Sequence, residues 1–96
     1  MEIIHLENQN FEELTKETTL VDFYANWCGP CKMIAPELEK VESQIKVIKV
    51  DVDEFEELAR KYGVMSIPTL ILFKDSKEIK RNIGFMDKER IEKFLK

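Results

Sequence analysis

Apolar residues follow two alternating patterns along this chain. Short runs rich in β-branched and aromatic residues predict strands, whereas apolar residues three or four positions apart predict helices. Strands are expected at residues 3–6, 20–25, 47–52, 69–73 and 78–83. Helical spacing occupies a segment ending near residue 18, residues 32–45, residues 54–62, and the segment after Asp87. The pattern therefore predicts an α/β protein with the element order βαβαβαββα.

Polar residues at the segment ends predict where the helices begin. Either Asn8 or Asn10 can cap the first helix, and either Asp51 or Asp53 can cap the third. Asp87 stands where it would cap the last helix.

Glycine and proline divide the chain further. Gly63 is expected to end the third helix, and Gly84 to end the last strand. Residues 75–77 form a turn of hairpin size. Pro36 predicts a kink in the second helix, the alternative being that this helix begins at Pro36.

Size and charge exclude several classes of protein. The 96 residues fit one compact domain, 1–96, and 44% of them are hydrophobic, enough for a single core. The 15 basic and 19 acidic residues give a net charge of −4, which argues against a nucleic-acid partner. No apolar run approaches the roughly 20 residues of a membrane span, and residues 1–5 do not resemble a secretory signal. We therefore expect a cytoplasmic protein that does not bind membranes.

The chain has only two cysteines, Cys28 and Cys31. A structural disulfide stabilises by closing a long loop, and a bridge across three positions closes almost none. The two cysteines are therefore expected to have a chemical role and not a structural one. Cys28 follows a predicted strand directly and precedes a helix, where unpaired backbone donors and the helix dipole favour a thiolate, the attacking species in disulfide exchange. Cys31 lies one helical turn further along, close enough to attack a mixed disulfide, and Gly29 and Pro30 leave no bulky group over the sulfur.

Residues 21–32, Val-Asp-Phe-Tyr-Ala-Asn-Trp-Cys-Gly-Pro-Cys-Lys, resemble the active-site signature of the thioredoxin family. The resemblance covers essentially the whole chain, since Pro36, residues 49–53, residues 67–69 and Gly84 fall in the family's order. It implies the thioredoxin fold, a central mixed sheet with helices on both faces and an antiparallel hairpin at its end. It also implies a thiol–disulfide oxidoreductase that reduces client proteins, with Cys28 as nucleophile and Cys31 as resolving thiol. The implied electron donor is a flavin-dependent thioredoxin reductase, and no cofactor beyond the redox-active disulfide is expected of this monomer.

Asp22 and Lys49 are the candidate groups for proton transfer. Position alone leaves open whether Asp22, inside an apolar strand, is buried or reaches solvent at the strand end. The resemblance implies a buried proton acceptor beneath Cys31 with a pKa raised by desolvation. It makes Lys49 the partner of this carboxylate, the alternative being an ordinary surface lysine.

Six residues around the cysteines are expected to contact clients: Trp27, Gly29, Pro30, Ile67, Pro68 and Gly84. Trp27 could instead belong to the core. The bond before Pro68 would be trans by frequency alone, but the resemblance implies a cis proline that faces the cysteines.

Three other functions stay open on the residues alone. A zinc or iron–sulfur module would need further ligands, and His5 is the only histidine, so two chains would have to share a site. An interaction module would carry inert cysteines. A glutaredoxin-like or oxidising enzyme is the nearest alternative, but the Gly29-Pro30 pair resembles the reducing thioredoxin branch.

Overall fold

Every predicted strand and helix is present in the computed structural model, which describes residues 1–96 in the predicted order. The strands are β1 (Ile3–His5), β2 (Thr19–Tyr24), β3 (Lys46–Asp51), β4 (Thr69–Lys74) and β5 (Lys77–Ile83). The helices are α1 (Phe11–Leu14), α2 (Gly29–Lys40), α3 (Glu56–Lys61) and α4 (Lys88–Phe94).

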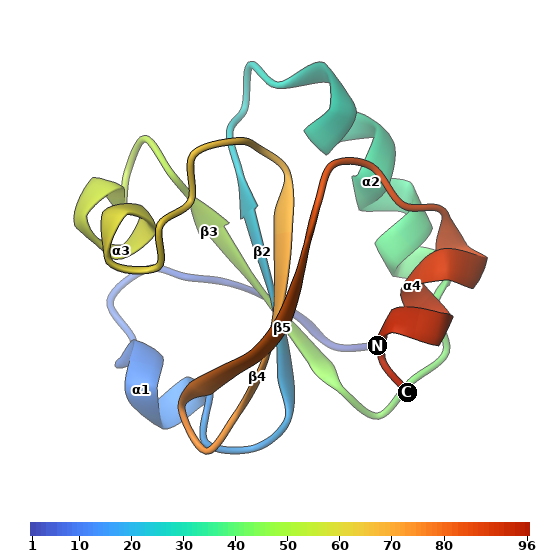
Figure 1. Cartoon of the computed structure of the whole chain (residues 1–96), viewed down its shortest axis with the longest axis horizontal. Helices are drawn as coiled ribbons and strands as arrows, with labels where there is room; N and C mark the ends of the chain where they lie inside the picture. The colour runs from blue at the N-terminus through green and yellow to red at the C-terminus, as the bar shows by residue number, and fades with distance from the viewer.

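The five strands form one mixed sheet in the order β1-β3-β2-β4-β5. β3 pairs in parallel with both β1 and β2, whereas β4 pairs in antiparallel with β2 and β5. Helices α1 and α3 lie on one side of this sheet, and α2 and α4 on the other (Figure 1). The expected fold, including the β4–β5 hairpin, is therefore confirmed.

The central strand β2 contributes to both halves of the core because its side chains alternate between the two faces. Val21 and Phe23 belong to the cluster under α1 and α3. Leu20 belongs to the cluster under α2 and α4, which includes Ile34 of α2. Asp22 is two positions from Leu20, so its side chain lies on the same face of β2, the face covered by α2. The strand therefore carries a carboxylate although almost all of its residues are buried.

Two of the predicted helix caps form as expected. Asn10 caps α1, its Oδ1 accepting the amide of Glu13 at 3.1 Å, and this settles the choice between Asn10 and Asn8. Asp87 caps α4, its Oδ1 accepting the amide of Arg90 at 3.0 Å.

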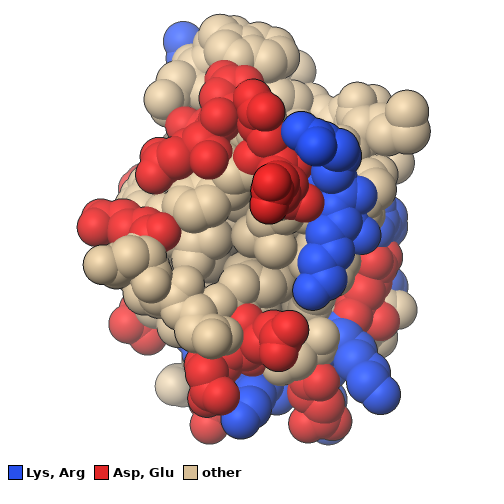
Figure 2. All heavy atoms as spheres, turned by 90° about the vertical axis from the view of Figure 1, so that its left-hand side faces the viewer, with Lys and Arg blue, Asp and Glu red and all other residues tan.

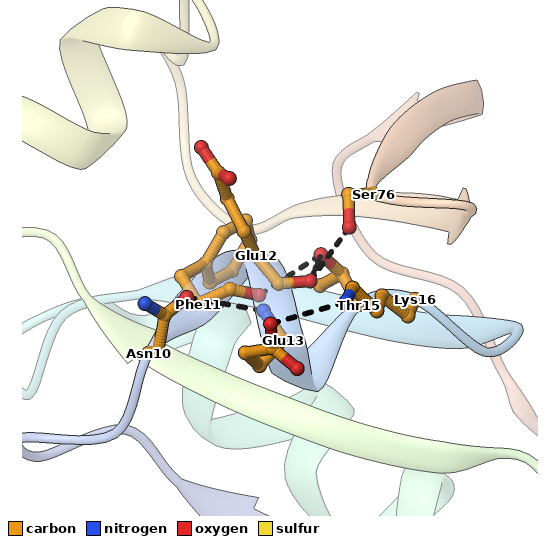
Figure 3. Close-up of polar contacts among 7 residues, drawn as sticks. All are labelled: Asn10, Phe11, Glu12, Glu13, Thr15, Lys16 and Ser76. Atoms are coloured by element: carbon orange, nitrogen blue, oxygen red, sulfur yellow. Dashed lines mark hydrogen bonds and ion pairs between the residues drawn. The ribbon is translucent and has the colours of Figure 1, made fainter.

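Helix α1 is much shorter than the pattern predicts, because side chains compete for its last carbonyls (Figure 3). The Thr15 hydroxyl donates to the carbonyl of Phe11 at 2.9 Å. The Ser76 hydroxyl donates to the carbonyl of Glu12 at 2.6 Å. Ser76 and Asp75 form the tight β4–β5 turn at φ values of 61° and 54°, so this hairpin turn is attached to the end of α1.

The predicted cap of α3 is wrong. This helix begins at Glu56, and the preceding Phe55 makes no side-chain cap. Both aspartates have other partners: Asp51 Oδ1 accepts the amide of Asp53 at 2.9 Å, and Asp53 Oδ2 accepts the indole N–H of Trp27 at 2.8 Å.

Helix α2 begins at Gly29 and runs through Pro36 to Lys40. The alternative that it begins at Pro36 is therefore wrong, and it ends earlier than the expected residue 45. Because the helix begins at Gly29, Cys28 lies at the helix N-terminus. No helix of the structure combines the length and the apolar character that crossing a membrane requires.

Candidate active site

Cys28 and Cys31 lie at the N-terminus of α2, just beyond the carboxyl end of β2. Cys28 is the N-cap residue, and its sulfur accepts the amide N–H of Cys31 at 3.2 Å. The two cysteines form a disulfide, with their Cα atoms 5.2 Å apart. Both are almost fully buried, so only a small part of the pair is open to solvent. After reduction, the free backbone donors and the dipole of this twelve-residue helix favour a thiolate at Cys28.

The loop before β4 lies against the nucleophile candidate. The carbonyl oxygen of Ile67 is 3.8 Å from the sulfur of Cys28, and the Ile67–Pro68 bond is cis, as expected. The carbonyl of Pro68 accepts the amide of Gly84 at 2.8 Å, which joins the end of β5 to this loop. The structure therefore brings three of the expected docking residues together beside Cys28.

Trp27 lies on the surface next to Cys28, with 69% of its area exposed, so the alternative of a core tryptophan is wrong. Gly29 and Pro30 are also exposed, in the first turn of α2. The ring of Trp27 is held by the hydrogen bond from Nε1 to Asp53. Sequence reasoning missed this role of Asp53, although it lies in the 49–53 segment that resembles the family. The sequence does not show whether Asp53 caps a helix or accepts a hydrogen bond from Trp27, which lies 26 positions earlier in the chain.

Asp22 is fully buried, so the alternative of a carboxylate at a solvent-exposed strand end is wrong. In the sheet it is paired with Lys49 of β3 and with Leu70 of β4. The Nζ of Lys49 is 3.5 Å from Asp22 Oδ2, and neither carboxylate oxygen receives a hydrogen bond. Burial raises the pKa of Asp22 from 3.8 to about 6, and the positive charge of Lys49 opposes this rise.

Lys49 is not a surface lysine, since only 11% of its side chain is exposed. Its ammonium also lies 4.6 Å from the ring centroid of Tyr24, a cation–π contact. Lys49, Tyr24, His5 and Cys31 line a pocket of about 240 Å³ that is open to the surface. Solvent therefore has access to the side of the site where Cys31 and Lys49 lie.

Metal ligation has no obvious place in this arrangement. No group of three or more His, Cys, Asp and Glu side chains is placed to hold a metal ion. His5, the only histidine, is exposed on β1.

Comparison with known proteins gives a consistent result. The family model for thioredoxin matches residues 2–96. A thioredoxin of Bacillus subtilis is 46% identical over 99% of this chain and 96% of its own length. A thioredoxin of Chlamydia trachomatis is 44% identical over 91% of this chain and 89% of its own length.

Solved structures agree with this. A mutant thioredoxin from Halobacterium salinarum superposes with a TM-score of 0.91 at 35% identity, over 98% of this chain and 88% of that one. Reduced Schistosoma mansoni thioredoxin superposes with a TM-score of 0.84 at 35% identity, over 99% of this chain and 96% of that one. The chain therefore belongs to the thioredoxin family, and it is a thiol–disulfide oxidoreductase of the protein-disulfide reductase type with Cys28 and Cys31 as its redox-active pair.

Proposed function

We propose that Cys28 attacks the client disulfide and that Cys31 resolves the resulting mixed disulfide. The thiolate of Cys28 bonds to one client sulfur, and the other client sulfur leaves as a thiolate. Cys31, once deprotonated, then attacks the Cys28 sulfur and displaces the first client sulfur. Two electrons pass to the client, which leaves with two thiols, and the protein is left with the Cys28–Cys31 disulfide.

The observation that carries this assignment is the place of Cys28 at the N-terminus of α2. Exposure does not separate the two cysteines, since 4% of Cys28 and 3% of Cys31 is accessible. Helix position does separate them. Only Cys28 is the N-cap residue, and its sulfur accepts a backbone N–H, an interaction that stabilises negative charge there.

Asp22 is the proton acceptor for Cys31 in this proposal. A carboxylate with a pKa of about 6 accepts a proton near neutral pH more readily than a solvated aspartate does. In the oxidised structure the sulfur of Cys31 carries no proton, and no hydrogen bond reaches either oxygen of Asp22. We propose that after reduction a water molecule relays the proton between them, entering through the pocket that Cys31 and Lys49 line. Lys49 acts as a positioning residue that limits how far the pKa of Asp22 rises.

The client is expected to dock against the exposed residues around Cys28. Trp27 provides an apolar surface, and the backbone at Ile67 lies close enough to pair with an extended client strand. Gly29 and Pro30 are exposed and Gly84 is partly exposed, and these three extend the surface, whereas Pro68 is buried. We propose that Pro68 contributes by holding the backbone of Ile67 beside Cys28.

The rest of the proposal follows from the chemistry of one cysteine pair. After each turnover the disulfide must be reduced again, and we assign this step to a thioredoxin reductase. The two sulfurs themselves take up and give away both electrons, so the protein needs no separate cofactor. We propose that the chain works as one domain, 1–96, as a cytoplasmic monomer, and without nucleic acid or membrane as a partner.

A turnover assay tests the proposal. The protein is added to insulin with dithiothreitol as electron source, and insulin reduction is followed by the precipitation of its free B chain. The wild-type protein should accelerate the reaction, and neither Cys28→Ser nor Cys31→Ser should sustain it. Acceleration by Cys28→Ser equal to that of the wild type would contradict the proposed chemistry.

A further inference from the structure

The largest hollow of the molecule lies outside the cysteine site, on the face of the sheet that carries α1 and α3. It has a volume of about 640 Å³ and is lined by ten residues. One wall comes from the segment between β1 and the start of α1, and the other from residues 53–58 and 61. Figure 2 shows this face, where uncharged atoms line a hollow with carboxylates on several sides of it and a strip of Lys and Arg atoms along one side. We call this hollow the α3 groove.

The floor of the α3 groove is apolar and firmly held. Leu6, Phe11, Phe55 and Leu58 are its four hydrophobic residues. Leu6 is buried, and the other three are partly buried and packed against the core cluster around Phe23. Because these side chains are anchored from below, the floor can contact an apolar side chain of a partner without rearranging.

The rim of the α3 groove is strongly acidic. Asp53, Glu54, Glu56 and Glu57 line it and are all exposed. The only cation that lines the groove is Lys61, whose Nζ lies 3.9 Å from Glu12 Oε1. Arg60, outside the groove lining, lies 3.6 Å from Glu56 Oε2, which leaves the other three carboxylates without an ion pair to a basic residue. Such a rim attracts a cationic partner segment and repels an anionic one.

The α3 groove is continuous with the active site. Asp53 lines the groove and accepts the hydrogen bond of Trp27, the residue next to Cys28. A client chain that leaves the attacked disulfide on the side of Trp27 therefore passes onto the groove. The longest dimension of the molecule is 31 Å, and an extended chain rises about 3.3 Å per residue. The groove is thus within about nine client residues of the reacting cysteine.

We propose that the α3 groove docks a segment of the client protein in which Lys or Arg residues flank an apolar side chain. This inference rests on the proposed function and names a class of client for it. The cations would pair with the rim, and the apolar side chain would contact the floor. A second copy of this chain fits the rim less well, because its net charge is −4.

The test uses disulfide-bonded peptides of one design that differ only in a tail of about nine residues. One tail carries lysines around a phenylalanine, and the other carries glutamates around the same phenylalanine. We expect the reduced protein to react about tenfold faster with the lysine tail at low ionic strength, and this preference to shrink near 0.5 M salt, where the Debye length is only a few ångströms. Equal rates for the two peptides at low salt would overturn the proposal.

Matched variants separate the groove from the overall charge of the protein. Glu56→Gln combined with Glu57→Gln removes two rim charges, and Glu39→Gln combined with Glu42→Gln removes two exposed charges elsewhere. The Glu56/Glu57 variant should lower the preference for the lysine tail roughly fivefold, because each exposed charge contributes only modestly to binding. The Glu39/Glu42 variant should keep most of the preference for the lysine tail. An equal loss in both variants would show that net charge, rather than the groove, selects the client.

A binding measurement with peptides that lack cysteines tests docking in the α3 groove independently of disulfide exchange. The two tails, made without cysteines and labelled with a fluorophore, are titrated with oxidised protein and followed by anisotropy. The lysine tail should bind more tightly than the glutamate tail, and the Glu56/Glu57 variant should weaken its binding. If neither disulfide peptide reacts but the lysine tail still binds, the proposed exchange is wrong and the docking site stands. Equal binding of the two tails would reject the docking site.

Discussion

Replacing Asp22 with asparagine should stabilise the protein near neutral pH and slow its catalysis. The pKa of Asp22 is raised by burial from 3.8 to about 6, so the folded state holds this proton more tightly than the unfolded state does. A raised carboxyl pKa means that ionisation of the group costs stability at high pH. At about 1.4 kcal/mol for each unit of pKa, the cost is roughly 3 kcal/mol once both states are ionised.

The pH dependence follows from the same two pKa values. Below about pH 4 Asp22 is protonated in both states, so Asp22→Asn should change the free energy of unfolding little. Between about pH 4 and pH 6 the gain should grow, and above about pH 7 it should stay near 3 kcal/mol. The same substitution removes the proposed proton acceptor, so release of the client should slow by at least about tenfold.

Urea unfolding of the oxidised protein from pH 3.5 to pH 8 measures the stability, and insulin reduction measures the activity. Asp75→Asn is the matched control, because Asp75 is exposed in the β4–β5 turn and asparagine tolerates its positive φ. Its effect should stay below about 0.5 kcal/mol at every pH. A stability gain of Asp22→Asn that did not vary with pH, or a loss at pH 8, would refute the reasoning. Unchanged activity would refute the role of Asp22 in proton transfer.

Two further predictions concern the partner of Asp22 and the cap of α1. Lys49→Met removes the charge that lowers the pKa of Asp22, so the loss of stability with rising pH should still begin near pH 4 but continue to a higher pH; an unchanged upper limit would show that the pair is not coupled. Asn10→Ala should lower the free energy of unfolding by about 1 kcal/mol through loss of the N-cap bond. Asn8→Ala should have almost no effect, and equal losses in the two variants would contradict the assigned cap.

The order of elements and the position of the cysteines could be predicted from the sequence, because both depend on local signals. Near-continuous apolar runs mark β2 and β4, since these strands are covered on both faces. The pair Cys28 and Cys31 follows β2 directly, so its place at a helix N-terminus needs no knowledge of the rest of the fold.

Contacts that depend on the topology could not be predicted in this way. Asp53 was expected to cap α3, but in the fold it bonds Trp27, 26 positions earlier in the chain, and a distant partner leaves no local signal. The length of α1 was missed for a similar reason, since the Ser76 hydroxyl donates to the carbonyl of Glu12 from the β4–β5 turn. The pairing of Asp22 with Lys49 required the family resemblance, because only the strand order makes β2 and β3 neighbours.

The α3 groove shows the same limit of sequence reasoning. Phe55 and Leu58 have the spacing of core residues, and the structure does pack them against the core. Their second role as part of a surface groove depends on Leu6 and Phe11, which the sheet brings beside α3. No local pattern predicts such a pairing.

Trapping of the mixed disulfide tests the central claim most directly. Reduced Cys31→Ser is mixed with a disulfide-bonded client, and the products are measured by intact mass spectrometry without reductant. The account predicts a stable covalent adduct bonded through Cys28, because the resolving thiol is missing, and almost no adduct with Cys28→Ser. Equal trapping by the two variants, or an adduct only through Cys31, would contradict the assignment of Cys28 as the nucleophile.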